Sequence, residues 1–146
     1  MIRKPDGYYL KVTCFINKEN FKEQKTNGKE IGLDFGIKTG VTTSEGEKFD
    51  VSIGESDRLK RLQKQLFRRV KGSNNRRKTI KLIQREYQKL SNRKQDIVNK
   101  LVHKLKAYDC IVMQDEQVGN WHKGMFGRQI QYSCLGLIKA KLKLLP

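Results

Sequence analysis

The sequence lacks the hydrophobic stretches that membrane and secreted proteins carry. None of its 146 residues lies in a run of about 18 apolar residues, so we expect no transmembrane helix and no membrane partner. Residues 1–7, Met-Ile-Arg-Lys-Pro-Asp-Gly, have no apolar region of the signal-peptide type. Both absences predict a cytoplasmic protein.

Cysteine is scarce as well, and its positions exclude a common kind of metal site. Cys14, Cys110 and Cys134 are widely spaced, and no Cys-x-x-Cys pair occurs. The sequence therefore encodes no structural zinc site. The odd number of cysteines indicates reduced and mostly buried thiols, as is usual in the cytoplasm.

Acidic residues are few relative to basic ones. The chain has 15 Asp and Glu against 32 Lys and Arg, a net charge of +17, and a modest hydrophobic content of 36%. Such a charge destabilises a compact domain through self-repulsion, which a polyanion would relieve. Nucleic acid is the first candidate for that partner.

Two helices joined by a tight turn are predicted in the middle of the chain. Ser56 or Asp57 is a typical helix start, and four apolar residues follow at helical spacing: Leu59, Leu62, Leu66 and Val70. Ser73 or Asn74 can cap a second helix over about 76–107. Because both helices carry an apolar stripe, we expect an antiparallel hairpin.

This hairpin has no acid between Arg58 and Arg85, although it contains many cations. Like charges along one helical face repel one another, whereas a phosphate backbone attracts them and releases counterions. We predict nucleic-acid contacts from the cations of this segment other than Lys60. They are Arg58, Arg61, Lys64, Arg68, Arg69, Lys71, Arg76, Arg77, Lys78, Lys81 and Arg85.

The apolar strand predicted near residues 30–36 contains one acid, Asp34. A carboxylate buried without a partner costs about 3–5 kcal/mol, so we expect a metal ion, an arginine or backbone N–H groups to compensate it. Further strands are predicted at 8–16, 41–43 and 48–53. The last two continue the Asp34 strand into an antiparallel meander.

A second group of acids follows an apolar strand of the buried type at residues 110–113. Asp115 and Glu116 come directly after Gln114. If this strand lies beside the Asp34 strand, the carboxylates converge and favour a divalent cation, which can promote phosphodiester cleavage. Alternatively, Asp34 accepts N–H groups of its turn and the other two acids are solvated.

The loop at residues 117–127 contains one aromatic side chain of interest. Trp121 can stack on a base, as we predict together with a contact from Lys123, or can anchor the loop to the core. His122 has no evident partner in the sequence and is expected to be an exposed loop histidine. A helix is expected over residues 128–144.

The chain resembles the TnpB (OrfB) proteins of insertion sequences in several motifs. Residues 32–38, Gly-Leu-Asp-Phe-Gly-Ile-Lys, resemble their first RuvC motif, Gly-Ile-Asp-x-Gly-x-Lys. The basic hairpin is similar to their Lys/Arg-rich helices. Residues 110–124, Cys-Ile-Val-Met-Gln-Asp-Glu-Gln-Val-Gly-Asn-Trp-His-Lys-Gly, resemble the second RuvC motif of one branch, and residues 129–143 resemble the helix that follows.

The resemblance implies an α/β, RNase H-like (RuvC) fold and RNA-guided, Mg²⁺-dependent cleavage of DNA, with DNA and a guide RNA as partners. Asp34 is then the first catalytic acid, and Lys38 a nucleic-acid contact. Most relatives place a Glu where this chain has Gln114. In a regular strand Glu116 lies on the same side as Gln114, two residues earlier. We therefore expect Glu116 to share the metal with Asp34, and Asp115 is the alternative second acid.

The resemblance also implies an incomplete domain. The third acid and the zinc-binding segment of the family are absent from this sequence. We expect residues 1–29 to end a wedge-like region and residues 30–146 to form a partial nuclease domain, with the basic hairpin at about 57–108 inserted. Such a chain would need missing N- and C-terminal parts for activity. The alternative is a non-catalytic nucleic-acid-binding remnant or regulator.

Overall fold

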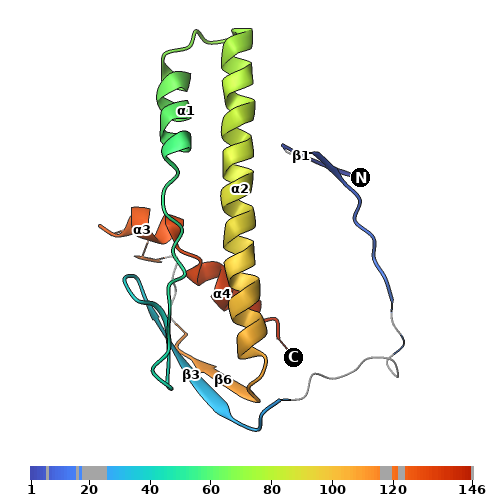
Figure 1. Ribbon diagram of the computed structural model, residues 1–146, viewed down its shortest axis with the longest axis vertical. Coiled ribbons are helices and arrows are strands. Elements are labelled where there is room, and N and C mark those ends of the chain that lie inside the picture. The colour runs from blue at the N-terminus through green and yellow to red at the C-terminus, as the bar shows by residue number, and fades with distance from the viewer. Residues whose placement is uncertain (6, 16, 18–25, 116–119, 122–123, 146) are drawn as a thin grey trace. The chain divides into compact units, whose positions relative to one another are not determined.

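The computed structural model of the chain describes residues 1–5, 7–15, 17, 26–115, 120–121 and 124–145. These residues form a mixed α/β structure with two sheets and four helices (Figure 1). The chain divides into two compact units. Unit 1 comprises residues 1–22 and 55–92, and unit 2 comprises residues 23–54 and 93–146. The α/β class expected from the sequence is confirmed at this level.

Unit 1 begins with a small antiparallel hairpin of β1 (Ile2–Lys4) and β2 (Gly7–Tyr9), in which Ile2 pairs with Tyr9. The sequence predicted a strand over residues 8–16, which is wrong in length because the strand ends at Tyr9. Residues 10–15 have no strand partner within the described chain and are exposed.

The predicted helical hairpin is present. Helix α1 (Asp57–Phe67) is capped by Ser56, whose side chain accepts the N–H of Leu59, and α2 (Asn74–Leu105) follows Ser73, whose side chain accepts the N–H of Arg76. Helix α2 contributes residues to both units. Val70, predicted on the apolar stripe of the first helix, lies beyond its end and is exposed.

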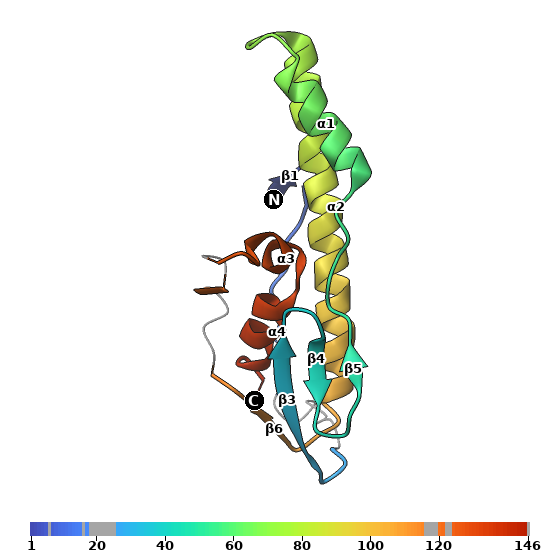
Figure 2. The ribbon, with the colours of Figure 1, turned by 90° about the vertical axis from the view of Figure 1, so that its left-hand side faces the viewer.

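Unit 2 is built on a sheet of four strands in the order β5-β4-β3-β6. These strands are β3 (Glu30–Gly36), β4 (Gly40–Thr43), β5 (Lys48–Phe49) and β6 (Cys110–Met113). The first three form the predicted antiparallel meander, and β6 adds to β3 in parallel (Figure 2). A parallel neighbour needs a long connection, which the two helices supply.

The core of unit 2 gathers apolar side chains from the sheet, the end of α2, α3 (Gly127–Tyr132) and α4 (Leu135–Leu142). The sequence predicted one helix over 128–144, and the structure divides it. The N–H of Cys134 donates to the carbonyl of Val51 at 2.8 Å, and the N–H of Ile53 donates to that of Tyr132 at 2.8 Å. This strand-like pairing interrupts the helix.

Two burial predictions are wrong. Strand β6 exists where expected, but it is not buried, since Val112 is 58% exposed and Cys110 is exposed. Strand β6 forms one edge of the sheet among the described strands. The thiols are not mostly buried either, because Cys14 and Cys110 are exposed and Cys134 alone is buried. In the part of the chain that the structure describes, no helix has an apolar stretch long enough to cross a bilayer.

Candidate carboxylate site and nucleic-acid interface

Asp34 lies on the solvent face of β3. Side chains alternate along a strand, and Ile31, Leu33 and Phe35 are buried on the other face. The expected cost of a buried carboxylate is therefore absent, and that part of the sequence argument is wrong. Asp34 forms no ion pair or side-chain hydrogen bond with any residue that the structure describes, so its oxygens are available to a ligand.

A shallow depression of about 340 Å³ surrounds Asp34. Leu33 pairs with Met113, the last residue of β6, so Gln114 follows the strand beside Asp34, and both Asp34 and Gln114 line the depression. Other polar groups come from β4 and the turn after it: Thr42, Thr43 and Ser44. The lining thus includes one carboxylate and one amide, while the hydroxyl of Ser44 accepts the N–H of Gly32 and that of Thr43 accepts the N–H of Glu47.

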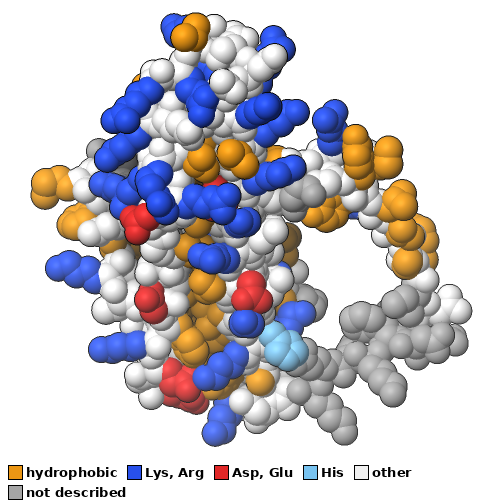
Figure 3. Space-filling view, turned by 45° about the horizontal axis from the view of Figure 1, so that its top comes forward, with side chains coloured by type: hydrophobic (Ala, Val, Ile, Leu, Met, Phe, Trp, Pro, Cys, Tyr) orange, Lys and Arg blue, Asp and Glu red, His pale blue; other side chains and the backbone are white. Residues whose placement is uncertain are grey.

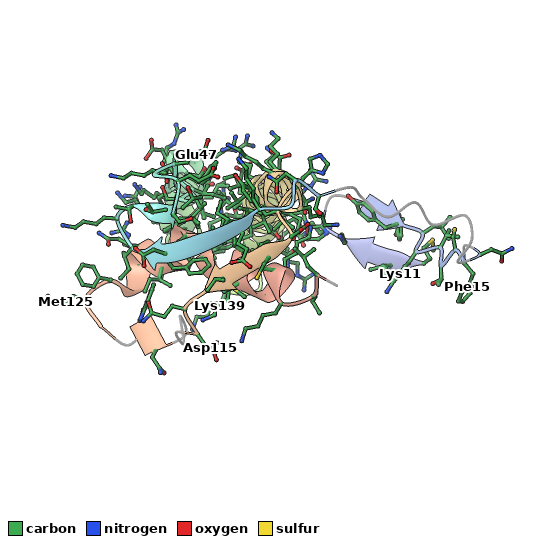
Figure 4. The ribbon with its side chains drawn as sticks, turned by 90° about the horizontal axis from the view of Figure 1, so that it is seen from below. Lys11, Phe15, Glu47, Asp115, Met125 and Lys139 are labelled. Carbon is green, nitrogen blue, oxygen red and sulfur yellow. The ribbon has the colours of Figure 1, made fainter. Side chains whose placement is uncertain are left out.

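Asp115 is directed toward α4. Its Oδ1 lies 3.0 Å from Nζ of Lys143 and 3.4 Å from Nζ of Lys139 (Figure 4). The hydrogen bond to Lys143, assisted by Lys139, lowers the pKa of the Asp115 carboxyl below its ordinary value. The structure therefore does not bring Asp115 to Asp34. Glu116 lies outside the described residues, and its role stays a prediction.

Lys139 is the residue that the sequence argument overlooked. It is only 8% exposed, and its Nζ also donates to the carbonyl of Gln114 at 3.0 Å. It thereby fixes the chain at the exit of β6, next to Asp34. The sequence contains a signal for this role. Helical spacing places Lys139 on the same buried stripe as Leu135, Ile138 and Leu142.

The donor atoms of the depression are of the type that Mg²⁺ prefers, since hard cations take carboxylate, carbonyl and hydroxyl oxygens. Among the described residues, however, no group of three or more His, Cys, Asp or Glu side chains is placed to hold a metal ion. Asp34 is the only carboxylate lining the depression within that part of the chain. The described residues alone thus offer a cation one carboxylate, which does not make a complete magnesium site.

The structure separates the cations of the hairpin into two groups. Four of them bond within unit 1. Arg58 pairs with the buried Glu86 at 3.4 Å, and Lys60 pairs with Glu55 and Asp57. Arg76 donates to the carbonyl of Leu66 at 2.8 Å, and Arg85 donates to that of Pro5 at 3.4 Å. These side chains have structural roles in addition to any contact with a ligand.

Other cations are free of ion pairs with the described acids. Arg61, Lys64 and Arg68 form a row along α1 and its C-cap and, with Arg58, line a depression of about 710 Å³. Figure 3 shows many Lys and Arg side chains over the hairpin end of the molecule. A further five lie near the turn and along the start of α2: Arg69, Lys71, Arg77, Lys78 and Lys81. Within unit 1, the α1 row is the strongest candidate surface for phosphate groups.

The remaining predicted contacts belong to unit 2. Lys38 is exposed in the turn between β3 and β4, two residues after Gly36. Trp121 is partly buried, which is compatible with either of its two predicted roles. His122 and Lys123 lie outside the described residues.

Comparison with known proteins shows the family. The model of the OrfB_IS605 family, described as "Probable transposase", matches residues 12–123, which include the Asp34 strand and the whole basic hairpin. The chain belongs to this family, and the resemblance noted in its motifs is confirmed.

Two relatives carry more specific names. "Putative RNA-guided DNA endonuclease InsQ" of Escherichia coli (strain K12) is 36% identical over 101 residues, which cover 66% of this chain and 25% of the relative. "Putative RNA-guided DNA endonuclease" of Streptomyces pristinaespiralis is 33% identical over 118 residues, which cover 77% of this chain and 29% of the relative. The chain thus spans little more than a quarter of the length of these relatives.

Proposed function

We propose that the chain is a nucleic-acid-binding segment of a transposon-encoded, RNA-guided DNA endonuclease, with DNA and a guide RNA as its partners. The observation that carries this proposal is the acid-free hairpin, whose row of Arg61, Lys64 and Arg68 has no ion pair with the described acids. The names of the two relatives supply the class of reaction.

The sheet of unit 2 is, in this proposal, part of an RNase H-like (RuvC) domain. An antiparallel meander with a parallel strand added after a helical connection supports that assignment. Its solvent face presents Asp34 next to Gln114. Asp34 would hold Mg²⁺ together with Glu116, and the ion when bound would supply positive charge beside a scissile phosphate. Further acids would come from parts of a longer protein.

Binding is tested by titrating the 146-residue chain with DNA and RNA at several salt concentrations. The proposal predicts an affinity that falls steeply with salt, because each neutralised phosphate releases counterions. Reversing the charges of Arg61, Lys64 and Arg68 should remove most of the binding. Reversing Lys29, Lys106 and Lys48, which belong to unit 2, provides a control of equal net charge. Equal losses in both triple variants would reject the hairpin as the interface.

Cleavage is tested with the chain joined to the C-terminal part of the Escherichia coli relative. The expected result is nicking of DNA that requires Mg²⁺ and disappears in Asp34→Ala. Nicking that persists in Asp34→Ala would show that this acid is not catalytic.

Gln114 favours a second candidate function, a binder without catalytic activity. Its neutral amide lies beside Asp34, at the position where the family resemblance implies a Glu, and an amide binds a divalent cation less strongly than a carboxylate does. A joined protein that binds nucleic acid normally but nicks none of it would favour this alternative.

A further inference from the structure

The turn end of the basic hairpin exposes two apolar side chains. Phe67, the last residue of α1, is 89% exposed, and Val70 is 76% exposed. Neither contributes to the core of unit 1, which near this helix consists of Leu59 and Leu62. An exposed aromatic ring beside cations offers a nucleic acid a stacking surface in addition to charge.

Cations surround this ring in the sequence and along the helix. Arg68 and Arg69 follow it directly, and Lys64 precedes it by three residues, which places Lys64 and Phe67 on neighbouring parts of the helix surface. No acid occurs between Arg58 and Arg85. A partner that covers Phe67 must therefore tolerate or require positive charge at its edge, which excludes a basic surface and favours a polyanion.

Arg61, Lys64 and Arg68, the C-cap residue, follow one another at steps of three and four residues, so they lie on one face of α1 over a rise of about 10 Å. One nucleic-acid backbone can follow such a row of cations. Phe67 lies at the end of that row. A base of the same strand can reach the ring only when it is not stacked and paired within a continuous duplex.

We propose that Phe67 stacks on an unpaired base of a nucleic-acid strand whose phosphates Arg61, Lys64 and Arg68 bind. The partner of the hairpin end is thus a single-stranded segment. This inference rests on the proposed nucleic-acid binding and adds to it the strandedness of the ligand. An apolar pocket of another protein is the competing occupant, which the experiment below separates.

The test uses the full chain and an oligonucleotide that carries a fluorescent purine analogue, offered as a single strand and as a duplex. Phe67→Ala should weaken binding of the single strand about 5-fold or more and should abolish the fluorescence quenching that stacking produces. Duplex affinity should not change. Phe67→Tyr keeps the ring and should retain both affinity and quenching.

Phe15→Ala is the matched control, because Phe15 is 94% exposed but lies outside the hairpin. An equal loss in this control would indicate general apolar adhesion and overturn the inference. Unchanged affinity and quenching in Phe67→Ala, with binding still abolished by charge reversal of the row, would overturn stacking but leave the proposed function intact. Failure of the unaltered chain to bind any nucleic acid would reject both. Far-UV circular dichroism confirms that each variant is folded.

Discussion

The guanidinium of Arg76 donates a hydrogen bond to the carbonyl oxygen of Leu66 at 2.8 Å, across the turn of the basic hairpin. The same carbonyl accepts the backbone N–H of Arg69 at 3.2 Å, so Arg76 adds a charged donor from the start of α2 to the end of α1. Its neighbour Arg77 is exposed and forms no ion pair with a described acid. Two adjacent arginines therefore have different tasks.

Arg76→Ala should lower the free energy of unfolding by about 1.5 kcal/mol, because a hydrogen bond from a charged donor is lost. Arg77→Ala should leave stability unchanged and reduce the salt dependence of nucleic-acid binding by about one counterion. Urea denaturation and binding titrations on the two variants measure these effects. If both variants lost equal stability, the structural role of Arg76 would be refuted.

Gln114→Glu should strengthen binding of Mn²⁺, used as a probe for Mg²⁺, about tenfold or more. The change places a second carboxylate beside Asp34 in the same depression, and two carboxylates attract a divalent cation more strongly than one. Isothermal titration calorimetry measures the affinity. The gain should vanish when Asp34→Asn is added, and a gain that survives this change would place the ion elsewhere.

Acidification should remove the contribution of Asp115 to stability. Lys143 and Lys139 lower the pKa of its carboxyl from the ordinary value of 3.8, so the stabilisation is present above that value and is lost as pH falls through the lowered pKa of the folded state. Asp115→Asn lacks this contribution at every pH. The difference in urea midpoint between the two proteins should therefore shrink below about pH 4. A constant difference would contradict the ion pair.

Gly40→Ala should destabilise the protein by about 3 kcal/mol or more. Gly40 has φ +76°, and a Cβ there would lie 2.2 Å from the carbonyl oxygen of Phe49. Gly46→Ala is the matched control, because Gly46 has φ +86° but open space around it. The control should lose only about 1–2 kcal/mol, which is the conformational cost alone. Thermal denaturation followed by circular dichroism compares the two, and equal losses would argue against the clash.

The parts of the fold that depend on local interactions could be predicted from the sequence. Ser56 and Ser73 lie before the first turns of α1 and α2, and each side chain caps its helix as expected. The spacing of apolar residues located both helices for the same reason, since helical contacts join residues three and four apart.

Features that depend on distant partners could not be predicted in this way. A single helix over 128–144 is consistent with local spacing, and only the pairing of residues 132–134 with 51–53 divides it. The aromatic run after Gly7 favours a strand, yet a strand extends only as far as its partner does, and β1 ends at Lys4.

From the sequence, the Asp34 strand was correctly placed beside the strand at residues 110–113, but the Asp34 side chain was wrongly treated as buried. Alternation along β3 indicated that Asp34 faces away from Leu33 and Phe35, so the acid did not need to be buried. The sequence pattern did not show whether other parts of the chain cover the face of β3 that carries Asp34. The direction of Asp115 depends on Lys143 and Lys139, which lie more than twenty residues further along the chain.

The parallel pairing of Glu30 with Cys110 has a consequence for how the chain folds. All of α1 and α2 lies between these residues, so β6 can join β3 only after a long loop has closed. Helices form in about a microsecond, whereas pairing of strands far apart in sequence is slow. We expect the helical hairpin to form early and the pairing of β3 with β6 to form later. Completion of the sheet, rather than formation of the helices, then sets the refolding rate.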